Sequence, residues 1–378
     1  MKQLLAATVP TALKRDGFDD LFNPPRLSKP EMHLLIKPFF LLDKHADRFK
    51  PIEYVYSVVE NGKAIKRGWW VEPHSKYGLP GSFDRDVTIG LYELVNTNYF
   101  SRGLPVPEVM PIGTLREFAS HLGIAGSGQN LAAIRESLKR LQHTLCTAEE
   151  TFFDNKKKRY VSLSFRLLKG VGFIGEDDGL GGALEQNFVI FDESILRNLN
   201  SGYVMVIDVD SVSSLKTSTA KQLYAHLAYR FFVEAQEGLT TWVADYDWLT
   251  VHLGIKKHPE LWRAKQQLDP AHKELLELGY ISFFEWDGWR VIYRPGVRWK
   301  GEQLRRKTGK KRSKAQPSVT GCSTVVAPVV EPVDPLIPAL AAFAGGLAVG
   351  EQRIKALGLT VEQARELCKE KLPNAPLD

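Results

Sequence analysis

The 378-residue chain has few cysteines and no long uncharged apolar segment. Its three cysteines, Cys146, Cys322 and Cys368, are far apart and lack the paired spacing of a zinc site or a disulfide framework. No apolar run is long enough to cross a bilayer, and residues 1–10 are not followed by the cleavage-like site of a signal peptide. These absences predict a cytoplasmic protein without a structural metal and without contact to a membrane.

The signatures of nucleotide-driven and DNA-nicking enzymes are missing as well. The chain has no Gly-x-x-x-x-Gly-Lys-Ser/Thr phosphate loop, and its nine histidines are scattered singly, not grouped for a metal beside a tyrosine nucleophile. The glycines of Gly123–Gly128 precede a helical pattern, but no parallel strand and following acid support a nucleotide site there. We therefore expect neither catalysis nor a cofactor.

The net charge of +6 is concentrated near the C-terminal third of the chain. Between Arg294 and Lys314 ten cations accompany one acid, so this window carries 10 − 1 = +9 and the remainder 6 − 9 = −3. Such a cationic segment suits a polyanion, whereas any nucleic-acid face on the rest of the chain must be local. The residues of this tail that we expect to contact DNA are Arg305, Arg306, Lys307, Lys310, Lys311 and Arg312.

Residues 113–168 predict two helices followed by a basic hairpin. Thr114 with Glu117 is a capping box for the first helix, and the turn Gly123–Gly128 separates it from the second. The second helix has an apolar stripe of Leu131, Ile134, Leu138, Leu141 and Leu145. Strands around Cys146–Phe153 and Tyr160–Phe165 then flank the tip Asp154–Arg159.

This order of elements is typical of a winged helix, in which a helix enters the major groove and hairpin cations lie along phosphates. An ordinary α+β core with one solvated basic helix face would give the same pattern. The expected DNA contacts are Gln129, Asn130, Arg135 and Lys139 on the helix, and Lys156, Lys157, Lys158 and Arg159 on the hairpin.

The same order recurs after residue 210. A helix over Ser218–Phe231, a strand at Thr240–Val243 and a helix capped by Asp245 precede a turn and a longer helix that starts at Pro259. The stripe of that helix is Leu261, Ala264, Leu268, Ala271, Leu275 and Leu278, with a kink expected at Pro270. Strands Tyr280–Trp286 and Trp289–Arg294, joined by Asp287-Gly288, close the second copy.

In this copy the predicted reading segment is the part of the helix before Pro270. Arg and Lys read guanine and Gln reads adenine in the major groove, whereas Asp269, Glu274 and Glu277, at and after the expected kink, disfavour phosphate contact there. The three tryptophans Trp286, Trp289 and Trp299 could stack on sugars, although packing in the hairpin is the preferred interpretation. The expected DNA contacts are Lys256, Lys257, His258, Trp262, Arg263, Lys265, Gln266 and, on the hairpin, Arg290.

The remaining patterns complete the predicted architecture. We expect a strand or sheet edge at His33–Leu42, a hairpin around Asn61-Gly62, a helix over Phe83–Asn98 capped by Ser82, and strands at Val171–Ile174 and Asn187–Phe191. The acidic, glycine-rich residues 175–182 between the last two strands are interpreted as a hairpin loop, not a metal site.

The chain then divides into an N-terminal arm (1–30), winged-helix domain 1 (31–205), winged-helix domain 2 (206–299), a basic tail (300–316), a Pro/Ala/Val-rich linker (317–349) and a C-terminal helix (350–378). The predicted class is α+β, two tandem winged-helix domains with a basic tail and a flexible C-terminal extension.

The run Tyr77-Gly78-Leu79-Pro80-Gly81-Ser82-Phe83-Asp84-Arg85-Asp86, together with Ser218–Phe231 and the two helix–turn–helix patterns, resembles the replication initiator protein A family of bacterial plasmids and the wider iteron-binding initiators. The resemblance covers Met32–Arg298; residues after Gln316 lie outside it. It implies a protein that binds repeated sites in double-stranded DNA at a plasmid origin, helps to open the adjacent duplex and recruits the host replicative helicase. Such initiators exist as dimers that repress their own promoter and as monomers that bind the origin.

By position, the resemblance places the reading helices at Gln129–Arg140 and His258–Gln266, and the wings at Lys156–Arg159 and Asp287–Arg290. Two other functions remain open. A transcription regulator with two winged helices would bind a single palindromic operator. A non-catalytic assembly protein would hold nucleic acid loosely through its basic tail.

Overall fold

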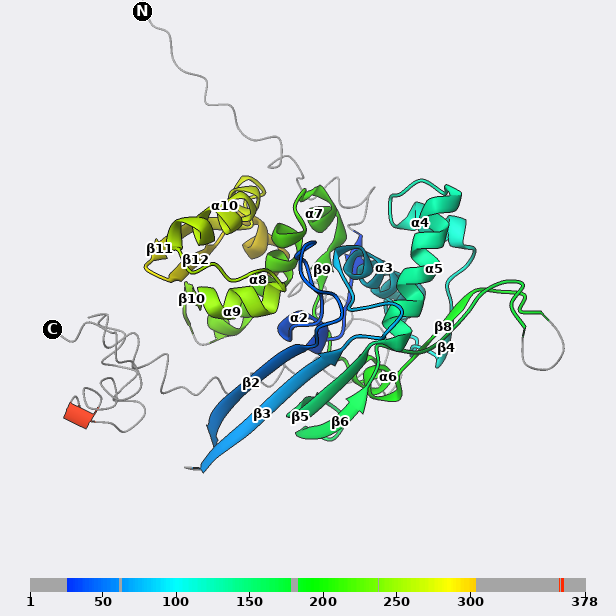
Figure 1. Cartoon of the computed structure of the whole chain (residues 1–378), viewed down its shortest axis with the longest axis horizontal. Helices are drawn as coiled ribbons and strands as arrows, with labels where there is room; N and C mark the ends of the chain where they lie inside the picture. Colours follow the sequence, from blue (N-terminus) through cyan, green and yellow to red (C-terminus); the bar gives the residue numbers. More distant parts are fainter. Residues whose placement is uncertain are drawn as a thin grey trace, which may run out of the picture. The chain divides into compact units, whose positions relative to one another are not determined.

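The computed structural model describes residues 26–60, 63–177, 183–236, 238–303, 360 and 362–363. The predicted basic tail beyond Gln303, the linker, nearly all of the predicted C-terminal helix and residues 1–25 of the predicted arm lie outside the described residues. The chain divides into two compact units, one comprising Met1–Tyr54 and Trp69–Val326 and the other Val55–Gly68 and Ala327–Asp378. The described parts form a mixed α+β structure with several small antiparallel sheets (Figure 1).

The first module consists of three helices and a three-stranded sheet. In chain order it contains α3 (Ser82–Asn98), β4 (Val109–Pro111), α4 (Leu115–His121), α5 (Gly128–His143), β7 (Leu168–Gly172) and β8 (Phe188–Phe191). The strands are antiparallel in the order β4-β8-β7. The helix stripes predicted from spacing form its core, because Val87, Leu91 and Val95 of α3 and Ile134, Leu138 and Leu141 of α5 are fully buried.

The second module repeats this arrangement. It contains α8 (Ser218–Gln236), β10 (Trp242–Asp245), α9 (Tyr246–Leu253), α10 (Leu261–Glu277), β11 (Ile281–Asp287) and β12 (Arg290–Pro295), with the strands in the order β10-β12-β11. In both modules the strand that precedes the helix pair therefore joins the last strand of the following hairpin. The predicted stripe of α10 is confirmed, since Ala264, Leu268, Ala271 and Leu275 are buried.

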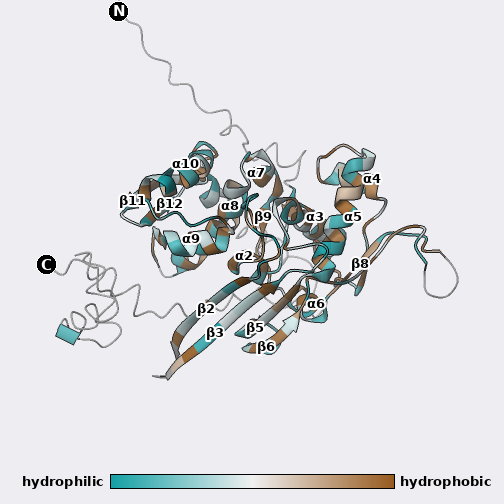
Figure 2. Cartoon of the chain, viewed as in Figure 1, coloured by the Kyte–Doolittle hydropathy of each residue, from teal (hydrophilic) through white to brown (hydrophobic). Residues whose placement is uncertain are grey.

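A four-stranded sheet contains the hairpin that lies between α5 and β7 in the sequence. Its strands are β2 (Ile52–Glu60), β3 (Lys63–Glu72), β5 (Leu145–Asp154) and β6 (Arg159–Phe165), in the order β2-β3-β5-β6. The β2–β3 pair confirms the strands predicted on either side of Asn61-Gly62. Figure 2 shows hydrophilic and hydrophobic segments along both the strands of this sheet and α5.

Short elements connect the larger ones. They are β1 (Leu27–Ser28), α2 (His33–Ile36), the 3-10 helix η2 (Phe100–Arg102), α6 (Glu193–Asn200), β9 (Ile207–Asp208) and α7 (Val209–Ser214). Strand β1 pairs with β9, so residues 27–28 belong to the folded structure and not to the loose arm predicted for 1–30.

Several local predictions need correction. The apolar run predicted as a strand at His33–Leu42 starts as helix α2, and all four residues of that helix are buried, which leaves no periodicity to distinguish helix from strand. Leu145 starts β5 instead of ending α5, Gly81 and not Ser82 is the N-cap of α3, and α10 starts at Leu261, two residues later than the predicted start at Pro259. The second hairpin turns at Gly288-Trp289, one residue later than predicted.

Candidate nucleic-acid interface

The first two turns of α10 expose the side chains predicted to read bases. Trp262 is 61% exposed, Arg263 and Gln266 are exposed, and Lys265 is half-buried, while Ala264 and Leu268 face the core. The Arg263 guanidinium lies 5.1 Å from the centre of the Trp262 ring and 3.6 Å from the Glu260 carboxylate. An exposed tryptophan beside an arginine gives this surface both an apolar and a hydrogen-bonding component.

The turn before α10 is held by a tyrosine beneath it. Tyr246 donates its hydroxyl proton to Gln267 Oε1 at 3.1 Å and accepts the backbone N–H of His258 at 3.1 Å. Burial raises the pKa of Tyr246 above its ordinary value of 10.0, so the hydroxyl remains a donor at neutral pH. Lys256 and Lys257 are exposed on this turn, and Lys257 pairs with Asp247 at 2.6 Å.

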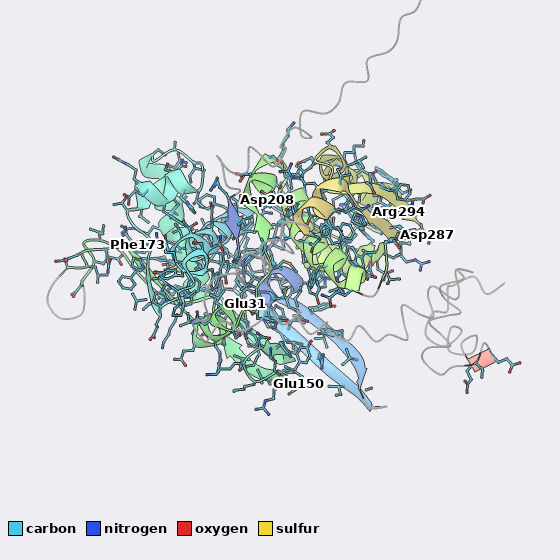
Figure 3. All side chains as sticks on the ribbon, turned by 180° about the vertical axis from the view of Figure 1, so that it is seen from behind. Glu31, Glu150, Phe173, Asp208, Asp287 and Arg294 are labelled. Atoms are coloured by element: carbon cyan, nitrogen blue, oxygen red, sulfur yellow. The ribbon has the colours of Figure 1, made fainter. Side chains whose placement is uncertain are left out.

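The β11–β12 hairpin contributes one exposed aromatic side chain and one cation. Trp289 is 43% exposed at the turn, and its ring centre lies 5.5 Å from that of Tyr246. Arg290 pairs with Asp287 at 3.3 Å. Figure 3 labels Asp287 and Arg294 at this hairpin.

The other two tryptophans pack, as the preferred interpretation expected. Trp286 donates its ring N–H to Asp269 at 2.9 Å, and Trp299 is buried against Phe231. Beyond Pro270, Glu274 also makes an internal contact, because it accepts the backbone N–H of Lys216 at 2.6 Å. Glu274 therefore helps to hold the fold.

In the first module the start of α5 is occupied mainly by its own turn. Ser127 is the N-cap and accepts the Asn130 N–H at 3.3 Å, while the Asn130 side-chain amide donates to Ala125 O at 2.8 Å. Gln129 is exposed beside them. Of Gln129 and Asn130, the two residues predicted to contact DNA here, only Gln129 keeps its whole side-chain amide available for DNA.

Arg135 and Lys139 lie further along α5 and face the β7–β8 hairpin. The Arg135 guanidinium lies 4.5 Å and the Lys139 ammonium 5.5 Å from the centre of the Phe173 ring. Both also approach Glu176, at 3.6 Å and 3.4 Å. Figure 3 labels Phe173 where this hairpin leaves the module. The two cations therefore hold the hairpin against α5, although each keeps part of its surface exposed.

Arg140, the last residue of the helix segment that the resemblance identified for reading, is buried. Its guanidinium pairs with Asp84 at 2.7 Å and with Glu136, and its Nε donates to Tyr77 O at 2.8 Å. A side chain committed to these three partners cannot reach a base edge.

The sheet order corrects the predicted wing of the first module. The hairpin that shares a sheet with β4, as β11–β12 does with β10, is β7–β8; Lys156–Arg159 instead form the exposed tip of β5–β6 in the four-stranded sheet. Asp154 and Asn155 fix that tip to α6, with Asn155 N donating to Asn198 Oδ1 at 3.0 Å and Arg197 Nε 3.5 Å from Asp154. The basic tip is therefore a separate structure.

The β7–β8 hairpin, which in the first module has the place of β11–β12 in the second, is mainly acidic. Its one cation is Lys169 in β7, whereas Glu176, Asp177 and Glu185 belong to the described part of the segment between the strands. Phosphate contact by β7–β8 is therefore disfavoured. The pattern of two strands around a glycine-rich loop was visible in the sequence, but the cationic charge of the earlier hairpin directed the prediction to the wrong pair of strands.

Among the described residues, no helix combines the length and the apolar composition of a membrane span. They hold no group of three or more His, Cys, Asp or Glu side chains arranged to bind a metal ion. The six predicted contacts of the basic tail, from Arg305 to Arg312, lie beyond the described region.

Comparison with known proteins gives two similar crystal structures. A structure of selenomethionine derivatives of domain 2 and domain 3 of RctB matches with a TM-score of 0.42 and 14% identity, over 68% of this chain and 95% of that one. A second structure of RctB domains 2-3 matches with a TM-score of 0.40 and 13% identity, over 70% of this chain and 97% of that one. No family model matches the chain, and no curated protein matches it.

Proposed function

We propose that the chain is a sequence-specific DNA-binding replication initiator whose two modules are tandem winged helices. The observation that carries the proposal is the first half of α10, where Trp262, Arg263 and Gln266 are exposed on a helix whose opposite face is buried. The helix follows a turn with two exposed lysines and is followed by a hairpin with an arginine. This combination supplies base-edge donors, phosphate-directed cations and an apolar contact surface on one module.

Two exposed side chains of α10 have the chemistry to read base edges in the major groove. Arg263 can donate two hydrogen bonds to guanine O6 and N7, and Gln266 can bind adenine N6 and N7. Lys256 and Lys257 on the preceding turn provide charge for phosphates, which position the helix without reading sequence. The first module contributes Gln129 and the partly exposed Arg135 and Lys139, so its share of base recognition is smaller.

The resemblance to plasmid initiators suggests three activities for the chain. The initiator binds several direct repeats at a plasmid origin, opens the neighbouring duplex and recruits the host replicative helicase. Because the sequence has no phosphate loop for ATP, opening draws on binding energy and on the bending of easily unstacked base steps. Dimers and monomers of the chain divide promoter repression and origin binding between them.

Footprinting of the full chain on its source plasmid, repeated over a series of salt concentrations, tests the function. We expect protection of several direct repeats beside an A·T-rich stretch. A single protected palindrome would support a transcription regulator instead. Uniform coating without phased sites, with a steep dependence on salt, would mean that the basic tail binds without reading and would refute the initiator proposal.

The assignment of α10 is tested by Arg263→Ala combined with Lys265→Ala. The double variant should lose about 1–3 kcal/mol of discrimination for each lost base contact, measured as the ratio of affinities for the protected site and for random DNA. Lys273→Ala is the matched control: this exposed lysine lies on the same side of α10 as Trp262, but eleven residues or about 16 Å further along the axis. Equal discrimination by the double variant and the control would exclude α10 as the reading helix.

A further inference from the structure

The sequence run that the family resemblance identified, Tyr77–Asp86, has no contact role in the interface described above. Its last three residues lie near the start of α3. Asp84 is 1% exposed; its Oδ2 accepts a hydrogen bond from Gly81 N at 2.6 Å and its Oδ1 accepts one from Arg140 Nη1 at 2.7 Å. Arg140 is on α5, so Asp84 fixes that helix to the first turn of α3.

The next two residues extend from α3 to the other module. Arg85 is 2% exposed and donates to the backbone oxygen of Ser218, the first residue of α8. It is held in place by Asp86, whose Oδ1 accepts from Arg85 Nη2 at 2.7 Å. The second oxygen of Asp86 lies 3.4 Å from the ammonium of Lys221, also on α8. Arg85 and Asp86 therefore fix the first helix of the second module.

Backbone hydrogen bonds also link Pro80, in the same sequence run, to the turn before α10. Leu41 N donates to Pro80 O at 2.8 Å, and the following residues, Leu42 and Asp43, both donate to Gly254 O at 2.9 Å. Gly254 has a φ of 58°, and a Cβ at this position would lie 2.2 Å from Phe40 O. The segment thus contacts the turn between α9 and α10 at a distance that only glycine permits.

From these contacts we infer that Asp84, Arg85 and Asp86 are positioning residues that fix α5 and α10 relative to each other and thereby set the spacing between the two DNA segments that the modules contact. This inference rests on the proposed function for its DNA part. Asp84 binds α5, whereas Arg85 and Asp86 bind α8. Because Asp84 and Arg85 are buried, water cannot replace a partner that a substitution removes. Linked modules gain affinity only when the separation of their sites matches the geometry of the link, so a rigid link makes binding sensitive to spacing.

The DNA experiment inserts base pairs between the segments protected by the two modules. Positions whose protection is lost in the Arg263/Lys265 double variant define the segment of the second module. An insertion of about five base pairs turns one segment to the opposite face of the duplex. Wild-type affinity should then fall by on the order of 100-fold, the size of a lost bivalent advantage. Arg85→Ala and Lys221→Ala should bind the native spacing more weakly and lose only a few-fold on insertion.

Lys169→Ala is the control, because Lys169 pairs with Glu193 at 3.3 Å within the first module's part of the chain. It should show the wild-type dependence on spacing. Adding Lys221→Ala to Asp86→Ala should change nothing further, because Asp86 is the ion-pair partner of Lys221 and is already absent. A wild-type spacing profile in Arg85→Ala and Lys221→Ala would overturn the inference.

A second measurement decides the inference without DNA. Spin labels at Gln129→Cys and Gln266→Cys, in a full chain with Cys322→Ser and Cys368→Ser, report the distance between α5 and α10 by double electron–electron resonance. We expect one narrow distance distribution that broadens in Arg85→Ala and Lys221→Ala but not in Lys169→Ala. An equally narrow distribution in all variants refutes the positioning role, whereas failure to protect any DNA site refutes the proposed function alone.

Discussion

Acid should destabilise the second module through His226, which is buried and has no carboxylate partner among the residues that the structure describes. His226 lies on α8, is 1% exposed, and its Nε2 is 3.1 Å from the backbone oxygen of His252. Since a carbonyl oxygen only accepts, Nε2 carries the proton of a neutral ring. Burial lowers the pKa of His226, the hydrogen bond to the His252 carbonyl opposes this effect, and the nearby Arg230 adds to it; together they bring the pKa from 6.5 to about 4.

The sign and size of the effect follow from the two pKa values. The unfolded chain takes up a proton near pH 6.5 and the folded chain only near pH 4, so the stabilisation from neutral His226 is complete above pH 6.5 and is lost as the pH falls towards 4. Between pH 7 and pH 5 the loss is about 2 kcal/mol, calculated from the proton-binding difference. Burial and the neighbouring His226 also lower the pKa of His252, so the two rings act in the same direction.

The prediction is tested with His226→Gln, whose amide can still donate to the His252 carbonyl. Urea unfolding of both proteins at pH 7 and pH 5 can be followed by fluorescence, because Trp248 stacks on His252 with ring centres 3.7 Å apart. The wild type should lose about 2 kcal/mol more than the variant between the two pH values, while losses from carboxylates are common to both and cancel. Equal losses in the two proteins would show that the folded state accepts a proton at His226 as readily as the unfolded chain does.

Two further outcomes are expected. Gly254→Ala should destabilise the chain by roughly 1–3 kcal/mol or more, since the added Cβ would lie 2.2 Å from Phe40 O and the residue has a φ of 58°; a midpoint of urea unfolding equal to that of the wild type would contradict the close contact. Replacing all four residues of Lys156–Arg159 by Ala should weaken binding to every DNA sequence alike and reduce the slope of log affinity against log salt by about 0.9 for each lost phosphate contact. An unchanged slope would mean that the tip of β5–β6 lies away from bound DNA.

Local chemistry explains why most helices were predictable from the sequence. The Thr114–Glu117 capping box predicted the start of α4, and the structure confirms it, with Glu117 N donating to Thr114 Oγ1 at 3.1 Å. The apolar stripe of α10 predicted its buried face. The same stripe separated Arg263 and Gln266, which are exposed as expected, from the core.

The pairing of strands was not predictable in this way. The β5–β6 hairpin was correct as a hairpin, but its partner β3 comes from residues 63–72, about 80 positions earlier in the chain. No local pattern records that pairing, so the order of the elements, the resemblance and the charge of the hairpin together assigned Lys156–Arg159 to the wing. Arg140 shows the same limit: its place on α5 suggested exposure, whereas Asp84, far away in sequence, explains its burial.

The β5–β6 insertion also has a consequence for the order in which the two modules fold. In the first module residues 144–167, 24 in all, separate α5 from β7, whereas in the second only residues 278–280, three in all, separate α10 from β11. Closing the longer connection costs roughly 2 kcal/mol more conformational entropy before the hairpin can pack on its helix. The second module should therefore form first, and amides of β11 and β12 should become protected from pulsed hydrogen exchange before those of β7 and β8. During synthesis the first module leaves the ribosome earlier, but its β7–β8 hairpin would pack on α5 more slowly than β11–β12 packs on α10.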